Sequence, residues 1–381
     1  MTLPKGFRAA GVAAGLKSTG GKDVSLIVND GPSDAAAVVF TSNRCKANPV
    51  LWSERVAADG RVRAVVLNSG GANCYTGPQG FQTSHATAER VATALGVSAS
   101  DVLVCSTGLI GDQLPRDRVL AGVDAAAKAL TVDGAADAAE AIMTTDTRPK
   151  RAMAQGDGWS VSGIAKGAGM LAPALATMLV VLTTDAEVDA AGCNAALRAA
   201  TGQTFDRLDS DGCQSTNDTV ALLASGASGV TPSQDDFTGA VTALCHDLAM
   251  QLLNDAEGSA HDITIEAVGA ASETDALEVA RAIARSGLFK CAVYGEDPNW
   301  GRVLAAAGTT TAAFQPHAVD VVFNGVPVCR GGEPGEPRDK VRFDGRAVAV
   351  TVDLHAGEHA ATVWTNDLTE AYVHENSAYS S

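Results

Sequence analysis

Residues 166–182 constrain the fold and chemistry of this chain more than any other segment. They read KGAGMLAPALATMLVVL, a glycine-rich loop with one lysine that leads into an unbroken apolar run. Such a run is typical of a buried strand. The hydroxyl of Thr177 is therefore predicted at the mouth of a core strand. On the residues alone, the plainest interpretation is a core strand entered through a loop containing glycine and proline.

Thr177 becomes a nucleophile only if a base accepts its proton. A free α-amine has a pKa of about 7.7–8.0, so a threonine at a chain N-terminus carries such a base. If Thr177 attacks the carbonyl of Ala176, an N-to-O acyl shift followed by hydrolysis releases this amine. The segment thus raises the hypothesis of self-cleavage between Ala176 and Thr177.

The same segment resembles the autoprocessing site of the ornithine acetyltransferase family, also known as bifunctional glutamate N-acetyltransferase/amino-acid acetyltransferase. Other motifs of that family follow in its order, and together they cover essentially the whole chain. These motifs are NSGGAN at 68–73, STG at 106–108, MTTD at 143–146, DPNWGR at 297–302 and ENSAYSS at 375–381.

The resemblance implies an α/β fold, an α-β-β-α sandwich of the N-terminal-nucleophile type with a smaller C-terminal α/β domain. We expect a catalytic domain over 1–271, a smaller domain over 272–360, and a tail over 361–381 that returns to the active site. Cleavage would give an α chain, 1–176, and a β chain, 177–381. In the family these chains stay associated, commonly as an α2β2 heterotetramer.

The Ser-Thr-Gly motif follows a predicted buried strand at 102–105. The Thr107 hydroxyl and the Gly108 N–H are donors at the end of a rigid element, which suits an oxyanion hole. On the residues alone the motif could equally cap a strand. The resemblance implies that Thr107 and Gly108 hold the tetrahedral oxyanion.

The resemblance also implies a substrate-binding set. Lys166 alone reads most simply as an exposed loop lysine, and Glu257 as a solvated residue at a helix end. The family usually has a lysine where this chain has His261. Whether this chain keeps the role of the family's lysine ammonium is therefore in doubt. The implied set is Thr144, Lys166, Thr177, Glu257, Asn376 and Ser381.

The implied reaction is double displacement in arginine biosynthesis. Thr177 takes the acetyl group of N2-acetyl-L-ornithine, and L-glutamate then removes it. No cofactor or metal is required, because the threonine ester stores the group. Some family members also use acetyl-CoA as a donor, and the sequence does not separate the two types.

Three alternatives remain open at this point. The first is an N-terminal-nucleophile aminopeptidase or amidase, in which water intercepts the acyl-enzyme. The second is an antibiotic-pathway acetyltransferase that uses the same donor. The third is an uncleaved amino-acid-binding protein.

The composition limits which binding partners and which cellular compartment are expected. The formal net charge of −16 argues against nucleic acid, since phosphate binding depends on clustered Lys and Arg. No apolar run approaches the ~20 residues that span a bilayer, and no signal peptide is visible. We therefore expect a cytoplasmic enzyme. The eight cysteines show no C-x-x-C spacing, so we expect reduced thiols and no structural metal.

Several local elements are expected from pattern. Helices are predicted over 78–96, over an alanine-rich stretch of roughly 117–142, and around 241–252. Asn324-Gly325 between apolar runs predicts a hairpin. The polar stretch 209–218 predicts an ordered loop near the site.

Overall fold

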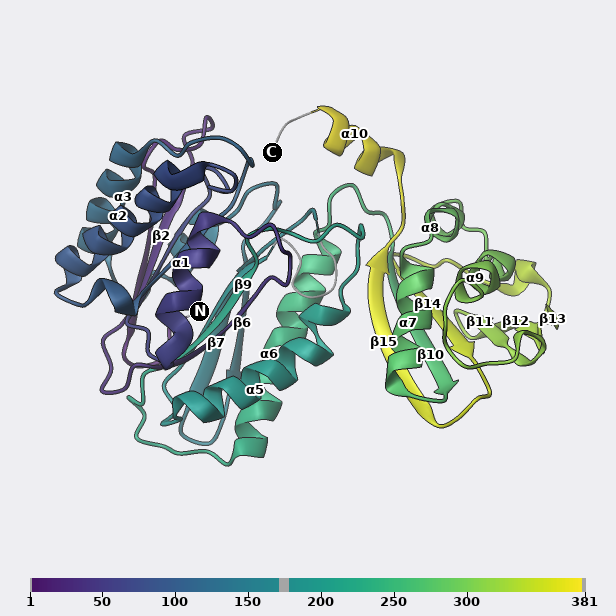
Figure 1. Cartoon of the computed structure of the whole chain (residues 1–381). Coiled ribbons are helices and arrows are strands. Elements are labelled where there is room, and N and C mark those ends of the chain that lie inside the picture. The colour runs from purple at the N-terminus through teal and green to yellow at the C-terminus, as the bar shows by residue number, and fades with distance from the viewer. Residues whose placement is uncertain (1, 171–177, 379–381) are drawn as a thin grey trace.

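Two sheets pack face to face in the larger part of the chain in the computed structural model (Figure 1). The structure describes residues 2–170 and 178–378. The first sheet has the order β1-β2-β4-β5, formed by Phe7–Val12, Val24–Asn29, Ala64–Asn68 and Val102–Ser106. The second has the order β3-β9-β8-β7-β6, formed by Ala35–Phe40, Thr219–Ala224, Leu179–Thr184, Ser160–Lys166 and Lys150–Gln155.

Strand β8 shows why the apolar run after Thr177 forms a central strand. All of its residues are buried, and successive side chains enter different cores. Leu179 and Val181 face the first sheet, whereas Val180 and Leu182 face the helices on the other side. A strand covered on both faces needs such an uninterrupted apolar sequence.

Helices cover the outer faces of both sheets, which completes the α-β-β-α order predicted for this chain. Val91 of α2 and Val123 of α3 pack on the first sheet. Leu197 of α5 and Leu248 of α6 pack on the second. The helices of this part are α1 Asn48–Val56, α2 Gly77–Leu95, α3 Arg116–Ala129, α4 Ala135–Ala141, α5 Ala190–Gln203 and α6 Gln234–Asn254, with short 3₁₀ turns at Ala57–Asp59, Ala99–Asp101 and Phe205–Arg207.

The expected helical stretch of roughly 117–142 is wrong as a continuous element, because it divides into α3 and α4. Between them, Thr131 forms a backbone bridge with Ala9 of β1, through hydrogen bonds of 2.9 and 3.0 Å. A Cβ on Gly134 would lie 1.8 Å from the Ala9 carbonyl oxygen. The segment between α3 and α4 therefore passes close along the edge strand β1, and this contact interrupts the helix.

A third sheet, with its own core, forms the smaller part of the molecule on the other side of α6 (Figure 1). Its order is β13-β12-β11-β14-β10-β15, formed by Glu333–Pro334, Val326–Arg330, Asp320–Phe323, Ala347–Asp353, Asp262–Ala270 and His359–Asn366. Its helices are α7 Glu273–Ala284, α8 Gly287–Tyr294 and α9 Trp300–Ala307, with 3₁₀ turns at Pro316–Ala318 and Arg338–Lys340. The sheet includes residues on both sides of the predicted boundaries at 271 and 360, and the division into domains stays a prediction.

The last described helix, α10 Glu370–Ala378, leads from β15 back toward the larger part (Figure 1). The predicted hairpin is confirmed, since Asn324-Gly325 joins β11 to β12. All eight cysteines are described, and each is a free thiol. None of the helices within 2–170 and 178–378 has the length and apolarity needed to traverse a bilayer.

Candidate active site

One cavity of about 300 Å³ collects every predicted site residue that the structure describes. Its walls come from the ends of β5 and β7, the loop after α4, the loop before β9, and α10. Ala176, Thr177 and Ser381 lie outside the described residues. The predicted residues that line the cavity are Thr107, Gly108, Thr144, Lys166, Glu257 and Asn376.

The backbone at Thr107 and Gly108 is held by the loop that follows β4. The Thr107 N–H donates to the Asn68 carbonyl, and the Gly71 N–H donates to the Thr107 carbonyl, both at 3.0 Å. Gly108 has a φ of +127°, and a Cβ there would lie 2.9 Å from backbone atoms of Gly71. Only glycine fits this position, so the Asn68–Asn73 motif and the Ser-Thr-Gly motif together fix these two donors.

The interpretation of Lys166 as an exposed loop residue is wrong. It is the last residue of β7, paired with Leu179 of β8, and its side chain is buried. Its ammonium donates to the Thr107 hydroxyl at 3.2 Å. Burial lowers its pKa, while the attraction of Asp146 opposes this change. The Lys166 side-chain nitrogen therefore lies directly beside the two candidate oxyanion donors.

The Glu257 carboxylate faces the cavity from the segment after α6. It accepts hydrogen bonds from the Thr145 hydroxyl at 2.6 Å and from the Asn376 side-chain amide at 3.1 Å. Gly169 passes so close that a Cβ would lie 2.5–2.8 Å from the carboxyl atoms. Lys166 and Glu257 thus place opposite charges on one cavity wall, which matches the carboxylate and ammonium of an amino acid.

A buried carboxyl group lies beneath the start of β8. Asp218 accepts a 3.0 Å hydrogen bond from the Met178 N–H, the first described amide after Thr177. Burial raises the pKa of Asp218 well above its usual range, and the Met178 hydrogen bond opposes this change. The sequence pattern gave no signal for this residue beyond its place in the polar stretch 209–218.

That polar stretch is confirmed as a loop at the site, because Ser215, Thr216 and Asn217 line the cavity. The Asn217 amide donates to the carbonyls of Ala72 and Ser106 at 2.7 and 2.8 Å. It therefore joins the loops after β4 and β5. Sequence reasoning did not identify Asn217, since amide-to-backbone bonds across the chain leave no local pattern.

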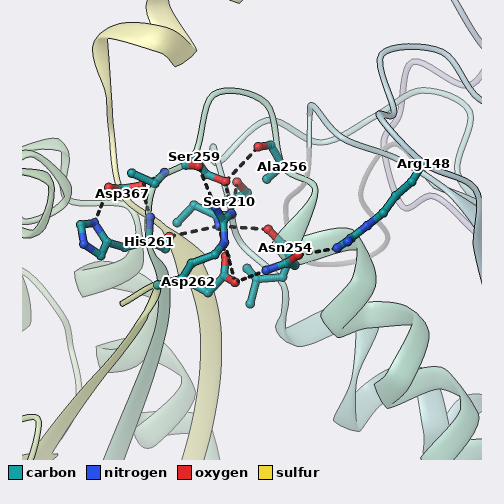
Figure 2. Close-up of polar contacts among 12 residues, drawn as sticks. Arg148, Ser210, Asn254, Ala256, Ser259, His261, Asp262 and Asp367 are labelled. Carbon is teal, nitrogen blue, oxygen red and sulfur yellow. Dashed lines mark hydrogen bonds and ion pairs between the residues drawn. The ribbon is translucent and has the colours of Figure 1, made fainter. Parts of the chain in front are cut away.

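His261 lies away from the cavity, at the junction between the two parts of the molecule (Figure 2). Its Nδ1 is 2.8 Å from the Asp367 carboxylate, which also accepts the N–H groups of Ala260 and His261. This contact links the start of β10 to the segment before α10. His261 therefore helps to place the helix that carries Asn376.

The DPNWGR motif also lies outside the cavity lining, in the turn between α8 and α9. The Asn299 side chain caps α9 by accepting the Arg302 N–H at 3.2 Å. Asp297 accepts a 2.8 Å hydrogen bond from the Asn299 amide. The motif forms a capped turn. No group of three or more His, Cys, Asp or Glu among the described residues is arranged to hold a metal ion.

Comparison with known proteins gives similarity along the whole chain. A sequence model of the ArgJ family matches residues 8–381. The arginine biosynthesis bifunctional protein ArgJ of Thermobifida fusca is 62% identical over 380 residues, which are 100% of this chain and 99% of that protein. The protein of the same description from Streptomyces avermitilis is 61% identical over 381 residues, 100% of each chain. A solved ornithine acetyltransferase from Mycobacterium tuberculosis, complexed with ornithine, is 53% identical, with 46% of this chain and 94% of that chain covered and a TM-score of 0.44.

Proposed function

The chain belongs to the ArgJ family, and on this basis we propose that it transfers the acetyl group of N2-acetyl-L-ornithine to L-glutamate through an ester of Thr177. It is an acetyltransferase of arginine biosynthesis, and the family match favours this activity over the amidase alternative. The observation that carries the proposed route is the single cavity in which two oxyanion donors, a buried lysine and a carboxylate meet.

The first half-reaction forms the ester. After cleavage, the α-amine of Thr177 takes the proton from its hydroxyl, and the oxygen attacks the acetyl carbonyl. The Thr107 hydroxyl and the Gly108 N–H stabilise the oxyanion that develops. The C–N bond then breaks, and the leaving nitrogen of ornithine takes the proton back from the Thr177 α-ammonium. The proposal is supported by the buried cation at Lys166, which donates to Thr107 and adds positive charge beside the oxyanion.

The second half-reaction reverses these steps with a different amine. The α-amine of L-glutamate attacks the ester carbonyl, the Thr177 oxygen leaves and regains its proton, and N-acetyl-L-glutamate departs. Both amino acids share an α-carboxylate, for which Lys166 and Thr144 are the proposed partners, together with Ser381 of the tail. Glu257 and Asn376 are proposed to address the ornithine ammonium.

Incubation of the purified protein with acetylornithine tests this function, with and without glutamate. We expect N-acetylglutamate only when glutamate is present, and neither product nor cleavage in Thr177→Ala. Release of acetate at the same rate with or without glutamate would instead identify a hydrolase. Replacing acetylornithine by acetyl-CoA in the same assay tests the second donor.

We also propose that the two fragments remain together after cleavage. In the second sheet, β3, β6 and β7 would come from the α chain, and β8 and β9 from the β chain. β7 and β8 pair along their length, from Val161↔Thr184 to Lys166↔Leu179, so separating the fragments would break this sheet. An α2β2 assembly in the cytoplasm is the proposed form, and native mass spectrometry measures its stoichiometry.

A further inference from the structure

The proposed substrate contacts come from three separate segments of the chain. Thr144 lies in the loop after α4, Lys166 ends β7, and Glu257 follows α6. Two charged groups that bind the two ends of one amino acid must keep a suitable spacing, because charge-assisted hydrogen bonds form only at short distances. A buried cluster behind the cavity wall connects these three segments.

Asp146 connects the first two segments through one carboxylate. One oxygen accepts the Thr144 N–H at 3.0 Å, and the other accepts the Gly167 N–H at 2.7 Å. The second oxygen also lies 2.6 Å from the Lys150 ammonium. The side chains of Asp146 and Lys150 are completely buried.

Lys150 extends the cluster to the third segment. Its ammonium lies 2.5 Å from the carboxylate of Asp255, two residues before Glu257. Asp255 in turn accepts the Thr147 N–H at 3.1 Å and also the Thr147 hydroxyl. The loop that carries Asp146 is therefore attached to the end of α6. Figure 2 shows another contact of this junction, in which Arg148 donates to the Asn254 side chain.

Two further hydrogen bonds close the cluster into a ring. The Glu257 N–H donates to the Ala168 carbonyl at 2.9 Å, two residues after Lys166. The Thr145 hydroxyl donates to the Glu257 carboxylate. Each of the three segments thus contacts the other two.

The charges of the cluster balance around Lys166. Asp146 and Asp255 are matched by Lys150 and Lys166, all of them buried. Burial would raise the pKa of Asp146, but Lys166, Lys150 and the Gly167 N–H outweigh it, so the pKa is lowered. Asp146 is therefore held as a carboxylate, in a position that depends on these partners.

We propose that Asp146, Lys150 and Asp255 form a positioning unit that sets the spacing between Lys166 and Glu257, and thereby the fit of the α-amino-acid substrate. None of the three side chains lines the cavity, so they act through the residues that do. The inference rests on the proposed function, since it assumes that Lys166 binds the carboxylate of the amino acid and Glu257 binds its ammonium.

The double variant Lys150→Met/Asp255→Asn tests the proposal in the full-length protein. It removes one positive and one negative charge, so the remaining Asp146 and Lys166 still balance. We expect an unfolding temperature close to that of the wild type. The KM for acetylornithine should rise by about tenfold or more, while kcat changes by less than about threefold. Calorimetric binding of ornithine should weaken by a similar factor.

Asp255→Asn alone is the second variant, because it keeps the Lys150–Asp146 pair and is nearly isosteric. It leaves the buried ammonium groups of Lys150 and Lys166 with a single carboxylate, so we expect a lower unfolding temperature in a chain that is still folded at the assay temperature. The KM should rise in the same direction. If the double variant fails to fold, this single variant decides the question. The matched control is Lys340→Met/Glu336→Gln, an exposed pair in the smaller part of the molecule, which should leave KM unchanged.

Wild-type KM and ornithine affinity in either folded cluster variant would overturn the proposal. A fall in kcat as large as the rise in KM would overturn it as well, since the cluster would then be merely structural. Failure of the proposed function looks different, because the wild type itself would then transfer no acetyl group to glutamate.

Discussion

Replacing Gly169 with alanine should weaken the binding of acetylornithine while leaving the fold intact. The added Cβ would lie 2.5, 2.7 and 2.8 Å from the Oε2, Cδ and Oε1 atoms of Glu257. Non-bonded atoms do not approach this closely, so one of the two groups must move. Because the obstacle is the end of a flexible side chain, Glu257 can rotate away at little cost in stability. Rotation would break its bonds to Thr145 and Asn376 and remove the carboxylate from the cavity.

The size of the effect follows from the contact that is lost. A hydrogen bond to a charged group contributes about 1.5–3 kcal/mol, so losing the carboxylate–ammonium contact should raise the KM for acetylornithine by about 10- to 150-fold. Steady-state kinetics measure this change, and thermal unfolding should show a nearly unchanged midpoint.

Gly202→Ala is the matched control, since Gly202 lies in α5 with no atom within 4 Å of an added Cβ. Alanine there should preserve KM and stabilise the helix by up to about 1 kcal/mol. A wild-type KM in Gly169→Ala would refute the assignment of Glu257 to the substrate ammonium.

Three further predictions follow from single groups. Thr107→Val should lower kcat by about 10²–10³-fold in the transfer assay, whereas Thr107→Ser, which keeps the hydroxyl, should retain activity. Asp218 has a raised pKa in the folded protein, so its contribution to stability should fall as pH rises through that pKa. In denaturant unfolding, the free energy of unfolding of Asp218→Asn should therefore rise relative to that of the wild type as pH increases above about 4. A difference in this free energy that does not change with pH would contradict the prediction. Burial lowers the pKa of Lys290 to about 8 from 10.5. Between pH 8 and 10.5 the Lys290 amine stays protonated only in the unfolded chain, so the free energy of unfolding of the wild type should rise by about 3 kcal/mol relative to that of Lys290→Met. Parallel profiles of this free energy against pH would contradict the prediction.

The sequence predicted those parts of the molecule whose physical cause is local. The apolar run of β8 and the Asn324-Gly325 hairpin each follow from a few neighbouring residues. The roles of Thr107 and Gly108 came from the family resemblance and stay a prediction. The order of the layers came from family resemblance, and the packing of β8 on two cores accounts for it.

Features that depend on distant contacts were not predictable from local pattern. The break between α3 and α4 arises from Ala9, more than a hundred residues earlier in the chain. The burial of Lys166 depends on Thr107, and that of Lys150 on Asp255. Periodicity carries no information about such pairs, because each partner lies on a different element.

The central claim is that Thr177 gains a free amine and then carries the acetyl group. Intact-mass spectrometry tests it most directly, on active protein incubated with acetylornithine in the absence of glutamate. The account predicts two polypeptides, 1–176 and 177–381, with the second heavier by one acetyl group that disappears when glutamate is added. A single unbroken and active chain, or a second fragment that never gains the acetyl group, would contradict it.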